Sequence, residues 1–183
     1  MKKWIVPVGI IVLLVVMMIS GYNNLVRTSE SVNGSWSQVQ NQLQRRADLI
    51  PNLVETVKGY ASQEKEVFTA VAEARAKLAG AATVGDAAQA DQALTGALGR
   101  LLAISESYPQ LKSDANFRTL QDELAGTENR IATARMDYNN SVESYNAKIK
   151  TAPTVLYAGI FGFEQRDYFK PNTNVNNVPA VNF

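Results

Sequence analysis

Apolar residues recur every seven positions along the chain from about residue 25 to residue 79. A seven-residue apolar repeat is typical of a helix that buries one stripe against neighbouring helices. We therefore predict one long helix over about residues 25–79, in which only Arg46 and Glu64 interrupt the stripe. The two series that form the stripe are Leu25, Val32, Val39, Arg46, Leu53, Tyr60, Val67 and Ala74, and Trp36, Leu43, Ile50, Val57, Glu64, Val71 and Leu78.

Pro51 lies inside this predicted helix. Proline in a helix interior removes a backbone hydrogen bond and clashes with the preceding turn, at a cost of about 3 kcal/mol. The apolar stripe nevertheless keeps its phase across this residue. We therefore expect a kink at residues 47–51 and not a break.

Two further helices are predicted, over about residues 86–107 and 114–150, with Asp86 and Asp114 as their N-caps. The third has the clearest repeat. Because the connectors are short, neighbouring helices should be antiparallel, and residue 150 should return to the start of the first helix. The predicted fold is all-α: residues 23–150 form an elongated antiparallel three-helix bundle with long, coiled-coil-like first and third helices. The repeat of the third helix comprises Phe117, Leu124, Ile131, Tyr138 and Tyr145.

The N-terminus carries an uncharged apolar stretch from Trp4 to Ile19. As a helix, residues 4–22 would extend about 28 Å, close to the roughly 30 Å of a bilayer's hydrocarbon core. We predict a membrane anchor over residues 1–22. The alternative is a cleaved signal peptide, but this stretch is longer than the usual apolar region, and Met18 or Ile19 would be a poor −3 residue at a cleavage site.

The charges that flank this stretch predict its orientation. Lys2 and Lys3 precede it, together with the α-amino group. Arg27 and Glu30 follow it at a greater distance. The positive-inside rule then places the N-terminus in the cytoplasm and the helical domain in the periplasm or outside the cell. We expect a single-pass protein of the plasma (inner) membrane.

The composition argues against most catalytic and nucleic-acid-binding functions. The 183 residues contain no cysteine and no histidine, so thiolate and imidazole chemistry and the usual zinc and haem ligands are missing. A lipobox cysteine is also missing. The formal net charge of +1 provides no basic field for nucleic acid. No phosphate-binding loop, calcium loop or nucleophile motif is present. We expect no enzymatic activity, no cofactor, no metal and no small-molecule substrate.

Arg46 and Glu64 are candidate residues for setting helix register, because they occupy positions of the apolar stripe. A charged side chain at such a position either extends out to solvent or pairs with an opposite charge. The first outcome is the simpler one. The second would pair Arg46 with a carboxylate near Asp137 or Glu143 on the third helix.

The C-terminal tail, residues 151–183, is rich in aromatic residues and ends in an Asn/Pro-rich stretch. Its segment Val155 to Phe163 is apolar and uncharged but too short to span a membrane. Three interpretations stay open: the tail covers its own bundle, touches the membrane interface, or docks on a neighbouring subunit, which we favour. The candidate assembly or membrane-contact residues are Tyr157, Phe161, Phe163, Tyr168 and Phe169.

Residues 22–32, 35–64, 108–146 and 159–169 carry distinctive sequences, among them RRADLIPNLVE within residues 35–64. These four segments resemble the LemA proteins. The resemblance implies a single N-terminal membrane helix followed by an α-helical domain, and it supplies no catalytic residues. Relatives in magnetic bacteria take part in building the magnetosome membrane. Some members carry a lipobox cysteine where this chain reads ISGYN. The segments are YNNLVRTSESV (22–32), SWSQVQNQLQRRADLIPNLVETVKGYASQE (35–64), YPQLKSDANFRTLQDELAGTENRIATARMDYNNSVESYN (108–146) and GIFGFEQRDYF (159–169).

Two functions are consistent with these patterns. The first is a non-enzymatic helical scaffold that self-assembles at the membrane and organises or remodels it. The second is an adaptor or modulator of another envelope membrane complex, such as a protease, a transporter or a stress system. The expected partners are the lipid bilayer, further copies of the chain and other membrane proteins.

Overall fold

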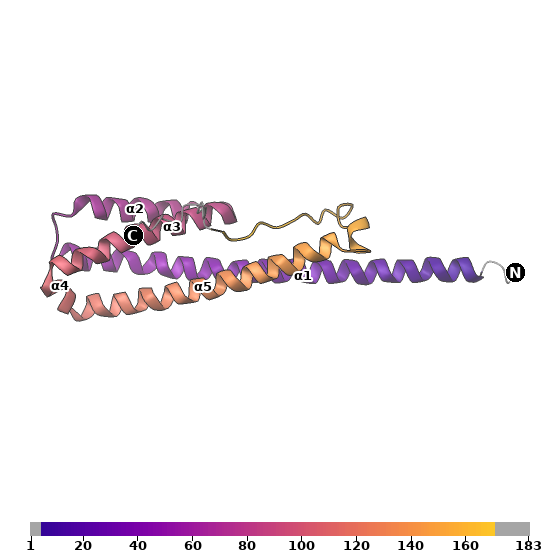
Figure 1. Ribbon diagram of the computed structural model, residues 1–183, viewed down its shortest axis with the longest axis horizontal. Helices are drawn as coiled ribbons and strands as arrows, with labels where there is room; N and C mark the ends of the chain where they lie inside the picture. Colours follow the sequence, from indigo (N-terminus) through magenta and orange to yellow (C-terminus); the bar gives the residue numbers. More distant parts are fainter. Residues whose placement is uncertain (1–4, 171–183) are drawn as a thin grey trace, which may run out of the picture. The chain divides into compact units, whose positions relative to one another are not determined.

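The structure is a computed structural model that describes residues 5–170. Over these residues the chain is helical and contains no strand, which confirms the all-α class. Figure 1 shows the elements in chain order. They are α1 (Ile5–Lys58), α2 (Lys65–Ala79), α3 (Val84–Ser107), α4 (Pro109–Ser113), α5 (Ala115–Lys150) and the 3-10 turn η2 (Thr154–Leu156).

Helix α1 runs from the apolar N-terminal stretch through Pro51 without a break, as predicted, and the kink expected at residues 47–51 stays a prediction. The prediction of one helix over residues 25–79 is wrong, because α1 ends at Lys58 and α2 begins at Lys65. The connector contains Gly59, a poor helix former. The chain reverses there, since Arg75 of α2 contacts the backbone of Ala47 in α1. The three-helix description therefore lacks two helices of the described chain: α2, which is separate from α1, and the short α4, which lies in the predicted connector before residue 114.

The described chain divides into two compact units. The first unit contains residues 5–40 and 133–167, and the second contains residues 41–132 and 168–170. In the second unit α2 packs against α3, and both helices bury apolar side chains together with the ends of α1 and α5 that belong to this unit. Its core includes Leu43, Ile50, Leu53, Val57, Val71, Leu94, Leu98, Leu101, Phe117, Leu124 and Ile131.

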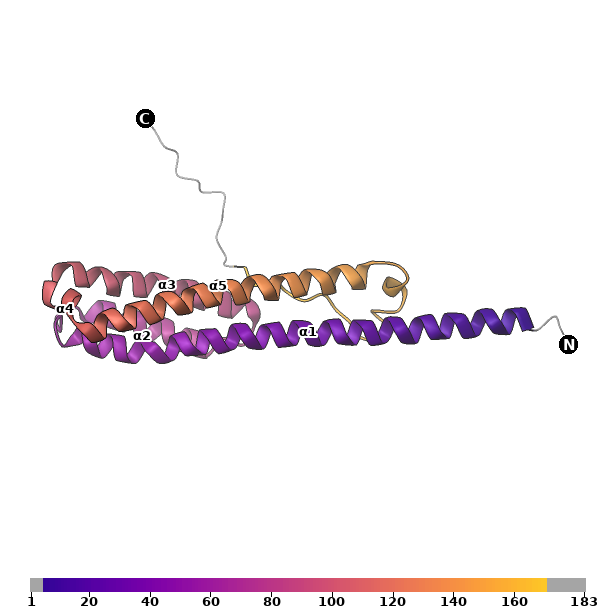
Figure 2. The ribbon, with the colours of Figure 1, turned by 90° about the horizontal axis from the view of Figure 1, so that it is seen from below.

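In the first unit the C-terminal part of α5 runs antiparallel to the N-terminal part of α1 (Figure 2). The Trp36 and Tyr138 rings lie 5.3 Å apart between centroids. Nearer the N-terminus of α1, the Lys148 ammonium donates to the Asn24 side-chain oxygen at 2.7 Å. The predicted return of the third helix to the start of the first is confirmed. The buried residues include Leu25, Val32, Val39, Tyr138, Val142, Tyr145 and Ile149.

The helix caps match the sequence in one case and correct it in another. Asp114 precedes α5 and accepts a 2.9 Å hydrogen bond from the Phe117 backbone N–H, as predicted. Asp86 is not an N-cap, because α3 begins two residues earlier and its N-cap is Thr83. Asp86 instead completes a capping box with Thr83, in which each side chain accepts a hydrogen bond from the other's backbone N–H.

Candidate functional site: a buried arginine and an aromatic turn beside the apolar segment

The apolar segment of α1 is the first functional feature of the chain. It is the one helical stretch among residues 5–170 that is long and apolar enough to cross a membrane, with a mean hydropathy of 2.0. Its large apolar side chains from Val8 to Ile19 are 44% to 60% exposed. This segment therefore presents apolar surface on all sides, as a lipid-facing helix does.

The chain after α5 turns back onto α1 where the apolar segment ends. The turn comprises η2 and the following residues to Phe163, and Gly162 adopts a positive φ of 75° within it. Tyr157 is only 6% exposed, and its hydroxyl lies against Gly21. A Cβ atom at residue 21 would overlap that hydroxyl, so the close approach requires glycine.

Three of the predicted tail residues gather at this point. Tyr22 meets the Phe161 and Phe163 rings edge-on, at centroid distances of 5.2 and 5.7 Å. Tyr157 lies 6.2 Å from Phe161. Such edge-to-face pairs stabilise beyond the area that they bury. We call residues 154–163 the aromatic turn.

The other two predicted tail residues belong to the second unit. Phe169 is 3% exposed, whereas Tyr168 is partly exposed and carries the Lys170 ammonium 5.0 Å from its ring centroid. The candidate list thus covers two separate parts of the structure. The Asn/Pro-rich end of the tail lies outside the described residues.

Hydrogen bonds hold the chain after the aromatic turn along α5. The side chain of Asn146 donates to the carbonyl oxygen of Arg166 and accepts from its backbone N–H, both at 2.9 Å. The Tyr138 hydroxyl donates to the Asp167 carbonyl at 2.8 Å. Burial raises the pKa of Tyr138 above its ordinary value of 10.0. These bonds hold residues 166–167 against α5 of their own chain, whereas docking of the tail on a neighbouring subunit stays a prediction.

Sequence reasoning missed Asn146. This residue is only 6% exposed, and it lies next to Tyr145 and one helical turn after Val142. The seven-residue repeat of the third predicted helix gave no signal for it, because Asn146 lies one position after the repeat residue Tyr145. The partners of Asn146 could not be predicted from the sequence, because they are backbone atoms of a segment without regular secondary structure.

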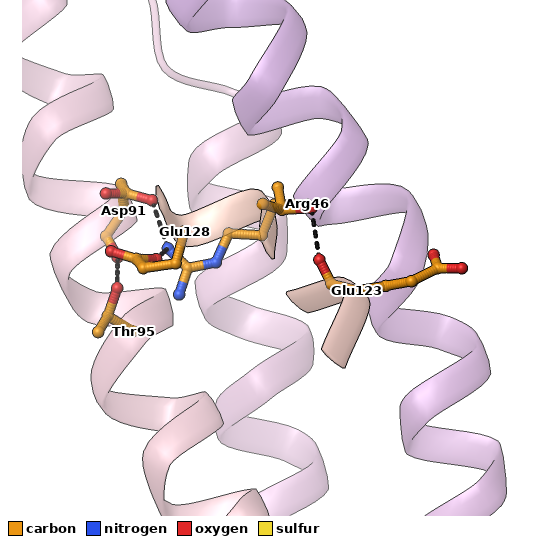
Figure 3. A network of polar contacts seen from close by, with 6 residues as sticks. Arg46, Asp91, Thr95, Glu123 and Glu128 are labelled. Atoms are coloured by element: carbon orange, nitrogen blue, oxygen red, sulfur yellow. Dashed lines mark hydrogen bonds and ion pairs between the residues drawn. The ribbon is translucent and has the colours of Figure 1, made fainter. Parts of the chain in front are cut away.

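A buried ionic network forms the second candidate site (Figure 3). Arg46 Nη1 lies 2.8 Å from Asp91 Oδ1 and 2.9 Å from Glu128 Oε2. The Arg46 and Asp91 side chains are 6% and 0% exposed, and Glu128 is 42% exposed. Desolvation lowers the pKa of Arg46, and the charge of Glu128 opposes that shift. The network joins α1, α3 and α5 through one guanidinium.

The structure corrects the predicted partners of Arg46. The charge is paired, but with Glu128 and Asp91 and not with Asp137 or Glu143. Glu128 precedes the predicted partner Asp137 on α5 by more than two helical turns. The sequence analysis missed Asp91. This residue lies three positions before Leu94, on the buried face of the same helix, and an acidic residue on that face was the available signal.

Glu64 does not occupy a helix seam. It lies in the connector between α1 and α2, is partly exposed and directly precedes α2. Its backbone carbonyl accepts hydrogen bonds from Val67 and Phe68. The prediction that Glu64 sets helix register assumed one continuous helix over residues 25–79, which the structure does not have. Within residues 5–170, no group of three or more acidic side chains comes together as a metal site would require.

The chain is similar in sequence to several known proteins. The magnetosome protein MamQ 2 of Paramagnetospirillum magneticum is 29% identical over 192 residues, which cover 91% of this chain and 71% of the relative. MamQ of Magnetospirillum gryphiswaldense is 30% identical, over 81% of this chain and 64% of its own length. Protein LemA of Metamycoplasma hominis is 26% identical, over 70% and 59%.

These relatives and the apolar segment of α1 together indicate a membrane location. The family model for LemA matches residues 35–183, which include the end of α1 and all of α2 to α5. The match spans most of the chain, and the chain belongs to the LemA family.

Proposed function

We propose that this protein is a non-enzymatic, single-pass membrane protein that acts as a helical scaffold and self-assembles at the membrane. The N-terminus lies in the cytoplasm and the helical domain on the other side of the membrane. In this function the protein organises or remodels the membrane that holds it.

The observation that carries the proposal is the unbroken helix α1, Ile5–Lys58. A catalytic domain tethered to a membrane needs only a flexible linker, whereas here the apolar segment continues as a helix into the packed domain. In the first unit, the end of α5 and the aromatic turn pack on α1 directly after this segment. If the helical domains of two copies bind each other, their positions would therefore fix the positions of the two membrane helices, because no flexible linker lies between domain and membrane helix.

Two further points support a structural role. Two groups of buried polar side chains in the described chain pair with an opposite charge or with backbone atoms, namely the Arg46 network and Asn146. Such buried polar contacts specify packing and register. The relatives named as magnetosome proteins favour a role at a membrane.

Self-assembly is tested on the full-length protein in detergent and in lipid nanodiscs. Size-exclusion chromatography with light scattering measures the protein mass in each particle. We expect a defined oligomer that persists on dilution. A monodisperse monomer at all concentrations would overturn the scaffold and favour the adaptor of another membrane complex.

Crosslinking locates the assembly surface. Because the chain has no cysteine, each variant carries a single reactive thiol. Met136 is 57% exposed on α5, the one large apolar side chain of that helix so exposed in the described structure. We expect Met136→Cys to crosslink between copies more efficiently than Gln38→Cys, an exposed polar position of the same unit.

A further inference from the structure

We propose that the aromatic turn, residues 154–163, is a second membrane contact. Its side chains Leu156, Ile160 and Phe161 enter the interfacial region of the leaflet at which α1 leaves the bilayer. The protein then holds the membrane by a spanning helix and by a short element that lies in one leaflet.

The first argument is the exposure of the turn. Leu156 and Ile160 are 76% and 82% exposed, and Val155 and Phe161 are 51% and 49% exposed. No charged residue occurs between positions 151 and 163. Four large apolar side chains exposed on one short turn are unfavourable in water, and exposed apolar surface of this kind favours a contact with an apolar partner.

The second argument is the position of the turn on α1. A hollow of about 370 Å³ is lined by Val15, Met18, Ile19, Tyr22 and Phe161. Four of its five lining residues come from the apolar part of α1 and its end, and Phe161 from the turn completes it. A bilayer that surrounds Val15 to Ile19 also surrounds this hollow. The occupant that fits an apolar hollow at this level is a lipid chain.

The third argument is the change from apolar to polar contacts along α1. Ile19 is the last residue of the apolar stretch, and Asn24 is already bonded to the ammonium of Lys148. Between these two positions lie Gly21 and Tyr22, where the aromatic turn packs. Aromatic residues concentrate at this boundary in membrane proteins because their rings are amphipathic.

This inference requires only that the apolar segment lies in a membrane. It does not depend on self-assembly, so a monomeric protein would leave it intact. A second copy of the chain is the competing occupant of the exposed turn, and the experiment separates the two.

The test places a fluorophore on the turn of the full-length protein. Ile160→Cys is labelled with the environment-sensitive dye NBD and reconstituted into phosphatidylcholine nanodiscs. Matched nanodiscs contain lipids with a quenching doxyl group near the headgroup. Gln165→Cys, an exposed polar position just after the turn, is the matched control. Leu156→Cys provides a second position on the turn, and circular dichroism verifies that each labelled variant is folded.

We expect blue-shifted emission at positions 156 and 160, and loss of most of their intensity with doxyl lipids. An interfacial element lies about 5–10 Å into the headgroup and acyl boundary, within reach of such a quencher. Position 165 should keep the emission of a water-exposed dye. Equal emission and equal quenching at positions 160 and 165 would overturn the proposal. So would a dye at position 160 that is shielded from aqueous iodide but not quenched by lipid, because a protein partner would then cover the turn.

Discussion

The Arg75 side chain donates a 2.9 Å hydrogen bond from Nε to the carbonyl oxygen of Ala47, four residues before Pro51. That carbonyl would ordinarily accept from the backbone N–H of residue 51, which proline lacks. Helix α2 folds back along α1 and supplies the missing donor. The proline is thus tolerated inside α1 because a second helix satisfies the group that it leaves open.

Arg75→Met should therefore destabilise the protein by about 1.5–3 kcal/mol, the range for a hydrogen bond from a charged donor. In a Pro51→Ala background the loss should be smaller, because the alanine restores a backbone N–H that can bind the Ala47 carbonyl. A double-mutant cycle measured by urea unfolding gives this coupling. Lys77→Met, at an exposed position of the same helix, is the control. Equal losses in both backgrounds would contradict this account of Pro51.

The seven-residue repeat was sufficient to predict most of the core. Nearly every residue of the predicted stripes that lies within a helix is buried or partly buried, from Leu25 to Val57 and from Phe117 to Tyr145. The hairpin at Gly59 was not predictable from that repeat, because both arms bury the stripe in the same phase. Tyr60 lies in the connector between α1 and α2, and it is 40% exposed although it occupies a position of the predicted stripe.

The polar contacts were less predictable than the core. Arg46 was recognised as a candidate from its place in the stripe, but its partners depend on the alignment of three helices. An error in the predicted position of one connector changes which residues of two helices face each other. The aromatic turn was recognised by composition. Its docking at Gly21 depends on a close approach between two segments far apart in the sequence, which no local pattern encodes.

The cap of α5 should make stability depend on acid. The pKa of Asp114 lies below its ordinary value of 3.8, mainly because the Phe117 backbone N–H binds the charged carboxylate, with a further bond from the Tyr60 hydroxyl. A lowered pKa in the folded state stabilises the protein at pH values above the unfolded pKa. This stabilisation is lost as the pH falls through the folded value.

Melting temperatures of the parent protein and Asp114→Asn measure this effect across pH. Asparagine keeps a side-chain acceptor but has no charge. The parent should be more stable at neutral pH, and the difference should vanish as the pH falls through the lowered pKa of Asp114 in the folded protein. Asp122→Asn, at an exposed position of α5, is the control. A difference that stays constant with pH would show that the charge of Asp114 does not contribute.

Two tyrosines of the first unit should respond oppositely to removal of the hydroxyl. Tyr138 donates to the Asp167 carbonyl, so Tyr138→Phe should cost about 1 kcal/mol. The buried hydroxyl of Tyr157 has no hydrogen-bond partner within the described structure. Tyr157→Phe should therefore be neutral or stabilising. Thermal unfolding in detergent compares them, and a larger loss for Tyr157→Phe would show that its hydroxyl has a partner in the membrane-bound protein.

The orientation proposed from Lys2 and Lys3 can be tested with one thiol. Ala82 is exposed in the connector between α2 and α3, and the parent chain has no cysteine. A membrane-impermeant maleimide should label Ala82→Cys in intact spheroplasts, and added protease should degrade the helical domain. Labelling and degradation that begin only after lysis would reverse the orientation.

The network around Arg46 yields the most stringent test of the described packing. Arg46→Leu removes the cation that faces the fully buried carboxylate of Asp91, and loss of one partner of a buried ion pair costs about 3–5 kcal/mol. Glu128→Gln should cost about 1 kcal/mol or less, because Glu128 is 42% exposed and solvent screens its charge. The double variant Arg46→Met/Asp91→Leu should recover much of the stability, since no buried carboxylate then stays behind. Urea unfolding measures the three losses, and light scattering measures the oligomeric state of each variant. An Arg46→Leu protein with undiminished stability and unchanged oligomeric state would show that the network does not set the register of α1, α3 and α5.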